Sequence, residues 1–275
     1  IRFTTSSRRS ATSSGLGMQP LKSAHLKIDR AEKHISELSQ LLKRERPYRY
    51  MLETDTKTLQ RAVYAKPNES VIDELALIGS DVLHQLRSAL DHAFFAIVKA
   101  RFPQGEGAAQ FPFSRDEAGL EGAVKNRCAH RVSADFFAFI MGLKPHGETG
   151  GNKLLYMLHE ANIVDKHRSF LPAADYKVIS SDLIRPYAPD FPPNLFDITI
   201  GACGRDVVWR GPHSILGTLG LPGIPLGRKH EFEIPIPVSI RFRVGQGHDS
   251  HELLTTLKNL ASAVRSVVNA MERFT

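Results

Sequence analysis

The sequence predicts an α+β fold: a mainly helical bundle with a small antiparallel β-sheet inserted before the C-terminal helix. Apolar residues recur at helical spacing near residues 21–42, 70–101 and 249–274. Residues 171–247 instead combine β-like runs with most of the later proline and glycine. A chain of 275 residues can bury a sizeable core without disulfides or a structural metal. We therefore expect one domain over residues 18–275, with its bundle in 18–170 and 248–275 and its sheet in 171–247.

The first 17 residues, IRFTTSSRRSATSSGLG, differ in composition from the rest. They are rich in serine, threonine and arginine and contain no acidic residue. We interpret them as a disordered tail, either an upstream read-through or a cloning scar before Met18. A transit peptide has a similar composition, but no amphipathic apolar face accompanies these arginines.

The first expected helix covers residues 21–42, where the apolar positions that repeat every seven residues are Leu21, Ile28, Ile35 and Leu42. Pro47 ends this helix, and the Tyr, Thr and Val content after it predicts a short hairpin that ends at Pro67.

The next expected helix covers residues 70–101, with Ser70 or Asn68 as its cap and Pro103 beyond its end. Its apolar side chains fall on one face, and Asp, His, Arg and Ser fall on the other. Shorter helices are predicted near Arg115 and over 133–143 and 152–164. The last helix begins at a capping-box pattern from Asp249 to Glu252.

Composition points to an intracellular protein with anionic partners. The two cysteines, Cys128 and Cys203, match neither a disulfide framework nor a zinc pattern, so we expect a cytoplasmic location. No apolar run approaches the roughly 20 residues that span a bilayer, so no membrane partner is expected. The net charge is +7 and the pI about 9.5, which favours partners such as RNA. The first 17 residues contribute three of these charges, which weakens that indication.

The first polar cluster lies on the helix predicted over 70–101, in the stretch LHQLRSALDHAFF. Arg87 and Asp91 are four residues apart and can pair. Arg87 and His92 are about 140° apart around the axis, so joint action needs a ligand or a second helix between them. His84 and Ser88 share this face, which contains neither Lys nor Glu from residue 80 to 92 and is enriched in groups that bind phosphate or exchange protons. A structural polar network is the competing interpretation.

The second cluster, Asn162 with DKHR at residues 165–168, ends the helix predicted over 152–164. If the helix continues, Asp165 and Arg168 project from an apolar side and need partners. Asp165 could then pair with Arg87 or His92, and Asp91 with His167 or Arg168. The alternative is that the helix frays after Val164, which leaves DKHR as a solvated C-terminal turn.

Other chemistry is less well indicated. Six residues could ligate a metal, but their spacing matches no HExxH-type pattern; they are His84, Asp91, His92, His159, Asp165 and His167. A serine triad and a dinucleotide loop lack their sequence signatures. Phe111, Phe113 and Trp209 could stack on bases, although apolar packing is the preferred interpretation.

LHQLRSALDH, FPFS and LLYMLHEANIVDKHR resemble a family of bacterial proteins of unknown function that carry an LRSALDH helix and an IDKHR segment. The resemblance covers roughly residues 70–172, and VDKHR stands here in place of IDKHR. It implies no particular reaction.

A weaker resemblance is to the HEPN helical domains, whose R-x4-H motif is similar to RSALDH at residues 87–92. Many of these domains are metal-independent ribonucleases. The resemblance implies that Arg87 holds the scissile phosphate and that His92 acts as acid or base while the RNA 2′-hydroxyl attacks. HEPN sites often form across a dimer, so it also implies a homodimer. Ser88 stands where an Asn is often found after the arginine, and a minimal HEPN bundle lacks the β-sheet.

The sequence thus predicts a HEPN-like, metal-independent endoribonuclease or RNA-binding protein that uses no cofactor or metal. Arg87 and His92 are its candidate catalytic residues. The candidate supporting residues are His84, Ser88, Asp91, Asp165, His167 and Arg168. The first alternative is a non-catalytic binding or regulatory protein in which these groups form a structural network. The second is a metal-dependent hydrolase with a His/Asp site.

Overall fold

The computed structural model describes residues 20–55, 60–167, 172–179, 185–186, 198–203, 206–207, 210–214, 229–234, 240–243 and 250–275. The tail expected over residues 1–17 lies outside this part of the chain, as do Trp209, Asp249 and much of the 171–247 region. The described part is mainly helical with antiparallel β structure, which confirms the expected fold class in its coarser form.

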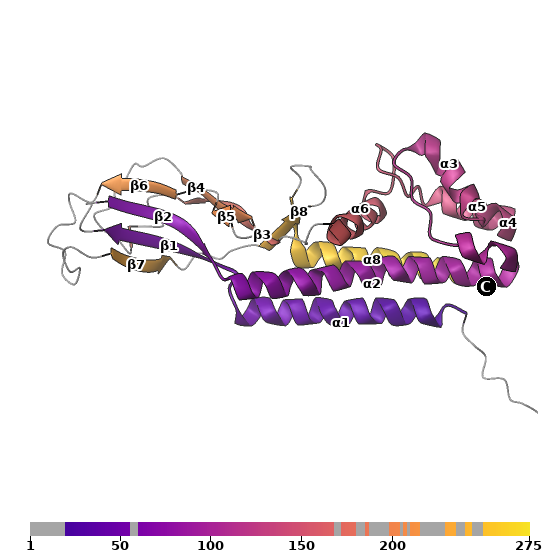
Figure 1. The fold of residues 1–275 in the computed structure, drawn as a ribbon, viewed down its shortest axis with the longest axis horizontal. Helices are drawn as coiled ribbons and strands as arrows, with labels where there is room; N and C mark the ends of the chain where they lie inside the picture. Colours follow the sequence, from indigo (N-terminus) through magenta and orange to yellow (C-terminus); the bar gives the residue numbers. More distant parts are fainter. Residues whose placement is uncertain are drawn as a thin grey trace, which may run out of the picture.

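Three long helices form the framework of the molecule. They are α1 (Lys22–Arg44), α2 (Glu69–Arg101) and α8 (Leu253–Met271). Figure 1 shows α1 and α2 side by side along the long axis, and α8 packs against both. The predicted apolar stripes are their buried faces. Each helix forms because its apolar side chains repeat at helical spacing, so burial of one stripe orders the whole segment.

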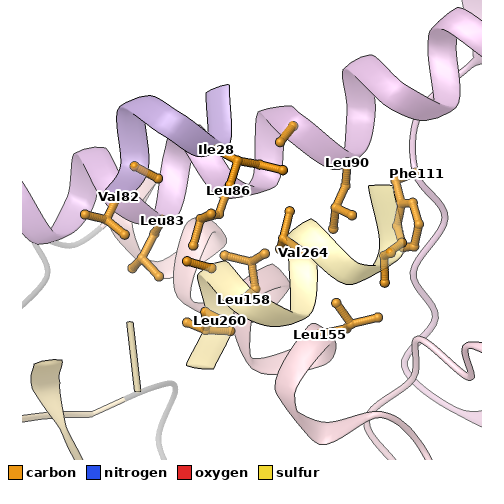
Figure 2. Packing of buried hydrophobic residues seen from close by; sticks show 14 of the residues in the cluster. Ile28, Val82, Leu83, Leu86, Leu90, Phe111, Leu155, Leu158, Leu260 and Val264 are labelled. Carbon is orange, nitrogen blue, oxygen red and sulfur yellow. The ribbon is translucent and has the colours of Figure 1, made fainter. Parts of the chain in front are cut away.

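The hydrophobic core lies where α1, α2, α8 and α6 (Lys153–His167) meet. Ile28, Leu86, Leu158 and Val264 come one from each helix and are fully buried in one cluster (Figure 2). Phe111, from the segment after η1 (Pro103–Ala108), points into this cluster near Leu90 (Figure 2). This burial anchors a connecting segment beside the polar part of α2.

Shorter helices lie near the C-terminal end of α2 (Figure 1). They are α3 (Glu117–Asn126), α4 (Ala129–Val132) and α5 (Ala134–Gly142), and η3 (Glu272–Phe274) follows α8. Asp116 caps α3 and Ser133 caps α5, each accepting a bond from an amide of the first turn. The predicted helices near Arg115 and over 133–143 are therefore present.

The cap of α8 differs from the prediction. The helix begins at Leu253, and the Glu252 side chain accepts hydrogen bonds from the amides of Leu254 and Thr255. Residues 250–252 form strand β9, so extended backbone continues up to the cap. The expected start at Asp249 is therefore wrong by several residues. A carboxylate only one residue before the helix satisfies its free amides.

The strands form two antiparallel sheets. The first has the order β6-β2-β1-β7 and contains β1 (Tyr48–Asp55), β2 (Gln60–Pro67), β6 (Arg210–Ser214) and β7 (Lys229–Ile234). The second has the order β5-β4-β3-β8-β9 and contains β3 (Pro172–Ile179), β4 (Ile198–Cys203), β5 (Asp206–Val207), β8 (Ile240–Arg243) and β9 (Ser250–Glu252).

The placement of the β structure corrects the sequence prediction. The antiparallel hairpin β1–β2 lies between α1 and α2 in the chain, near its N-terminal region, and occupies the centre of its sheet. A single sheet confined to the segment before the C-terminal helix is therefore wrong. Edge strands need a partner for their free backbone groups, and a hairpin of eight-residue strands offers two long edges. Strands distant in sequence pair with these edges.

Candidate functional site

Arg87 and Asp91 of α2 together hold the backbone of Phe111. The Arg87 Nη1 atom lies 2.5 Å from Asp91 Oδ1, which confirms the predicted pairing four residues apart on one helix. Arg87 Nη2 donates to the Phe111 carbonyl at 3.2 Å, and the Phe111 amide donates to Asp91 Oδ1 at 2.9 Å. Both backbone groups of Phe111 are thus satisfied by one ion pair. We call this arrangement the Phe111 clamp.

The clamp is partly removed from water. The Arg87 side chain is 12% exposed and that of Asp91 is 28% exposed. Burial lowers the pKa of the Arg87 guanidinium, Asp91 opposes this shift, and the nearby positive charge of Arg127 adds to it. Arginine stays charged throughout, so the shift reports an unfavourable environment for the cation and not a change of protonation state. A further anion beside Arg87 would relieve this environment.

Aromatic side chains border the clamp on one side. The Arg87 guanidinium carbon lies 4.7 Å from the centre of the Phe113 ring, a cation–π geometry. The Phe113 and His159 rings are stacked, with centres 4.5 Å apart and planes 3° from parallel. His159 belongs to α6, whereas Phe113 follows Phe111 in the loop. The stack therefore joins this loop to α6.

A pocket of about 460 Å³ opens beside the clamp and the Phe113–His159 stack. Residues from α2, the loop at 110–113, α3 and α6 surround it. Its polar lining residues are Arg87, Asp91, Gln110, Asn126, Arg127, His159 and Asn162. The volume falls within the range of about 300–1,000 Å³ of small-molecule sites. Two guanidinium groups against one carboxylate give the pocket a positive charge.

Arg127 supplies the second positive charge. It follows α3 directly, and its Nη1 atom donates to the carbonyl oxygen of Ala108 at 3.3 Å. In the part of the chain that the structure describes, no carboxylate lies within ion-pair distance of Arg127. Most of its five donors are therefore available to an anion in the pocket.

Asn162, a residue of α6, contributes a side-chain amide to the lining of the pocket. The residue is only 7% exposed, yet its side chain makes no hydrogen bond to any described residue. A carboxamide has two N–H donors and an acceptor oxygen. Among the described residues, the fully enclosed polar side-chain atoms without a partner belong to His146 and not to Asn162, so the Asn162 amide is open to the pocket that it lines.

His92 lies apart from this pocket. Its Nδ1 atom shares a 2.6 Å hydrogen bond with the hydroxyl oxygen of Ser23 on α1, and the residue is exposed. Arg87 instead faces the loop at residue 111, so the two residues of the R-x4-H motif have different neighbours. The 140° expected between them on the helix accounts for this separation. Of the two, Arg87 lines the pocket described above and His92 does not.

The remaining predicted site residues either lie outside the pocket or have side chains outside the described part of the structure. His84 is exposed and Ser88 half-buried on α2, and neither borders the pocket. Helix α6 continues to His167, so fraying after Val164 is wrong for the backbone. Asp165 and His167 lie in this last turn, but their side chains are outside the described part of the structure, and so is Arg168. Among the described residues, Asp91 accepts hydrogen bonds from Arg87 and from the Phe111 amide.

The part of the chain that the structure describes offers neither a metal site nor a membrane-spanning helix. That part of the chain holds no group of three or more His, Cys, Asp or Glu side chains close enough to bind a metal ion. In the same residues, no helix is long and apolar enough to cross a membrane.

The pocket contains residues that the sequence did not indicate. Arg127 and Asn126 come from the end of a short helix, where a basic residue is typical for the helix dipole alone. His159, Asn162 and Phe113 were singled out, but as metal, ion-network or packing candidates. Only the approach of α3 and α6 to α2 brings these side chains to Arg87. No pattern along the chain signals that approach.

The chain matches no protein-family model, and no curated protein or solved structure is significantly similar to it.

Proposed function

We propose that this protein binds single-stranded RNA and that the pocket beside the Phe111 clamp holds a phosphate and its nucleotide. The observation that carries the proposal is the pair of guanidinium groups, Arg87 and Arg127, in a pocket with one carboxylate. Arg87 is committed to the clamp, so Arg127 is the main contact for the phosphate. The positive net charge would attract RNA to the surface before this contact forms.

The proposal favours binding over cleavage. Acid–base catalysis on a phosphate held by Arg87 requires His92 within hydrogen-bond reach of the reacting atoms. His92 contacts Ser23 on α1 instead, so one chain does not supply both groups to one phosphate. An endoribonuclease of the HEPN type would need His92 from a second copy at the pocket. The proposed role of Arg87 and Asp91 is to position the loop at 111–113. The β strands after α6 are proposed to assist RNA binding.

The test is binding of a fluorescein-labelled seven-nucleotide RNA of mixed sequence, followed by fluorescence anisotropy. R127Q should weaken binding about 10-fold and reduce the slope of log Kd against log salt by about 1, because one phosphate contact is lost. K125Q is the matched control: Lys125 lies two residues away and pairs with Glu121 outside the pocket, so its loss should change Kd less than about 2-fold.

Two results would count against the proposal. Equal weakening by R127Q and K125Q would show that RNA binds through diffuse charge, and absence of binding by the native chain would remove RNA as the ligand. Electrophoresis of the bound RNA, with the native chain and with H92A, separates binding from cleavage. Cleavage that H92A abolishes would replace the binding function by the nuclease.

A further inference from the structure

We propose that the loop at residues 144–152 is a latch that opens locally and lets the ligand enter and leave the pocket beside the Phe111 clamp. In the closed position, which the structure shows, the latch holds together two parts of the pocket lining: the segment at 110–115 and helix α6. The inference rests on the proposed function for its ligand, RNA, and adds how access to the site is controlled. Opening does not depend on the identity of the ligand, so the two proposals can fail separately.

The latch is hydrogen-bonded to the segment that continues the pocket loop. The Ser114 amide donates to the carbonyl oxygen of Pro145 at 3.1 Å, and the Gly147 amide donates to the carbonyl oxygen of Arg115 at 3.2 Å. Ser114 directly follows the residues at 110–113 that line the pocket. The two hydrogen bonds therefore fix the end of this part of the lining.

The other end of the latch is attached to α6. Asn152 ends the loop, and its side-chain oxygen accepts a hydrogen bond at 3.1 Å from the amide of Leu155 in the first turn of α6. The Tyr156 ring packs so closely on Gly147 that a Cβ atom on this glycine would lie 2.5 Å from it. Tyr156 comes three residues before His159 on α6, so the latch holds the part of the helix that borders the pocket.

The closed latch contains a buried polar group without a partner. The side chain of His146 is fully buried, and neither of its ring nitrogens has a hydrogen-bond partner among the described residues. Buried polar groups are normally paired, because an unpaired one loses its hydrogen bonds to water without replacement. Opening of the latch returns the imidazole to water, so the closed position is less stable than its hydrogen bonds alone would make it.

The backbone of the closed latch is also strained. Lys144 has a φ of 48°, a left-handed conformation that residues with a Cβ atom rarely adopt, and Gly150 has a φ of 94°. A Cβ atom on Gly151 would overlap the carbonyl oxygen of His146, so the closed position requires glycine there. Strained backbone persists only where the surrounding contacts hold it. Loss of the hydrogen bonds to residues 114–115 would therefore release the loop as a unit.

Opening would separate the pocket lining at the Phe113–His159 stack. The stack is a contact between the pocket loop and α6. Release of Ser114 frees the residue next to Phe113, so this ring can leave His159 while the Phe111 clamp stays in place. Phe111 remains buried among the long helices, so the pocket widens without unfolding of the core. A ligand enclosed in the pocket needs this step to leave, and it needs the same step to enter.

Hydrogen exchange of backbone amides, followed by NMR, tests the opening without any ligand. In the native chain, the amides of Ser114 and Gly147 should exchange at a common rate, at least about 100-fold faster than the amide of the core residue Leu86. H146L removes the unpaired nitrogens at similar volume, so it should stabilise the closed latch and slow both amides about 10-fold. The control is H130L, at an exposed histidine of α4 outside the pocket, which should leave both rates unchanged.

Stopped-flow anisotropy with the labelled seven-nucleotide RNA tests the link between the latch and the pocket. Association and dissociation both pass through the open latch, so H146L should slow the two rates by the same factor, about 10-fold, and change Kd less than about 2-fold. H130L should leave both rates at their native values. A merely structural role of His146 would appear as a changed Tm with both RNA rates unchanged.

The outcomes separate the latch from the proposed function. Exchange of the Ser114 and Gly147 amides at the rate of the Leu86 amide would overturn the latch, because the loop would then open only when the protein unfolds. Local exchange together with RNA rates that H146L leaves unchanged would overturn its role at the pocket. Absence of RNA binding would overturn the proposed function, and the latch would still stand or fall on its exchange rates. If H146L fails to fold, the exchange rates of the native chain decide.

Discussion

Removal of Asp91 should destabilise the protein more than removal of Arg87. D91A eliminates the partner of a guanidinium that is 12% exposed and the acceptor of the Phe111 amide. Breaking a fully buried ion pair costs about 3–5 kcal/mol, and an unpaired buried amide costs about 1–3 kcal/mol. Asp91 itself is 28% exposed, so water replaces part of the lost contacts. We expect a loss of about 2–4 kcal/mol.

R87M should cost less, about 1–2 kcal/mol, because the remaining carboxylate keeps the Phe111 amide and some contact with water. The double variant R87M/D91A should lose less stability than the sum of the two single variants, since it leaves no unpaired guanidinium.

Urea-induced unfolding at pH 7, followed by circular dichroism, measures the three differences. In a chain of this size, each kcal/mol corresponds to roughly 2–4 °C in Tm, so a thermal scan gives an independent estimate. Equal losses for D91A and R87M, or strict additivity in the double variant, would refute the clamp as a coupled unit. The reasoning would also be refuted if D91A changed the free energy of unfolding by less than about 0.5 kcal/mol.

Three further predictions concern other parts of the fold. G151A should lower Tm strongly, because a Cβ atom at residue 151 would overlap the carbonyl oxygen of His146. The control is G122A on the exposed side of α3, where a Cβ atom meets nothing within 4 Å; it should leave Tm unchanged or raise it. L86A should cost about 2–5 kcal/mol in urea unfolding, since Leu86 is fully buried between the long helices. Burial, together with the neighbouring Glu160, raises the pKa of the Tyr156 hydroxyl above its ordinary value of 10.0. The stability that Tyr156 contributes is therefore fully present below pH 10.0 and is lost as the pH rises through the folded-state pKa. Y156F should reduce this alkaline loss of stability, measured by denaturation between pH 9 and 11.

The helical part of the fold could be predicted because its information is local. Apolar residues at helical spacing placed α1, α2 and α8 within a few residues, and Pro47 and Ser133 were recognised near element ends. The β structure was less predictable, because strand pairing depends on distant partners. The hairpin β1–β2 was expected on its own, but its position at the centre of a sheet with β6 and β7 follows from backbone pairing across the chain.

In the candidate site, too, the local features could be predicted from the sequence and the long-range contacts could not. The sequence by itself determined that Arg87 and Asp91 pair on one face of α2 and that His92 points elsewhere, because helical spacing alone sets these directions. Only the tertiary structure decided what that face meets: the Phe111 backbone, Arg127 after α3, and Asn162 on α6. Packing of helices depends on the complementarity of whole surfaces, which no spacing along a single helix records. A polar stripe on a helix thus became one wall of a positively charged pocket.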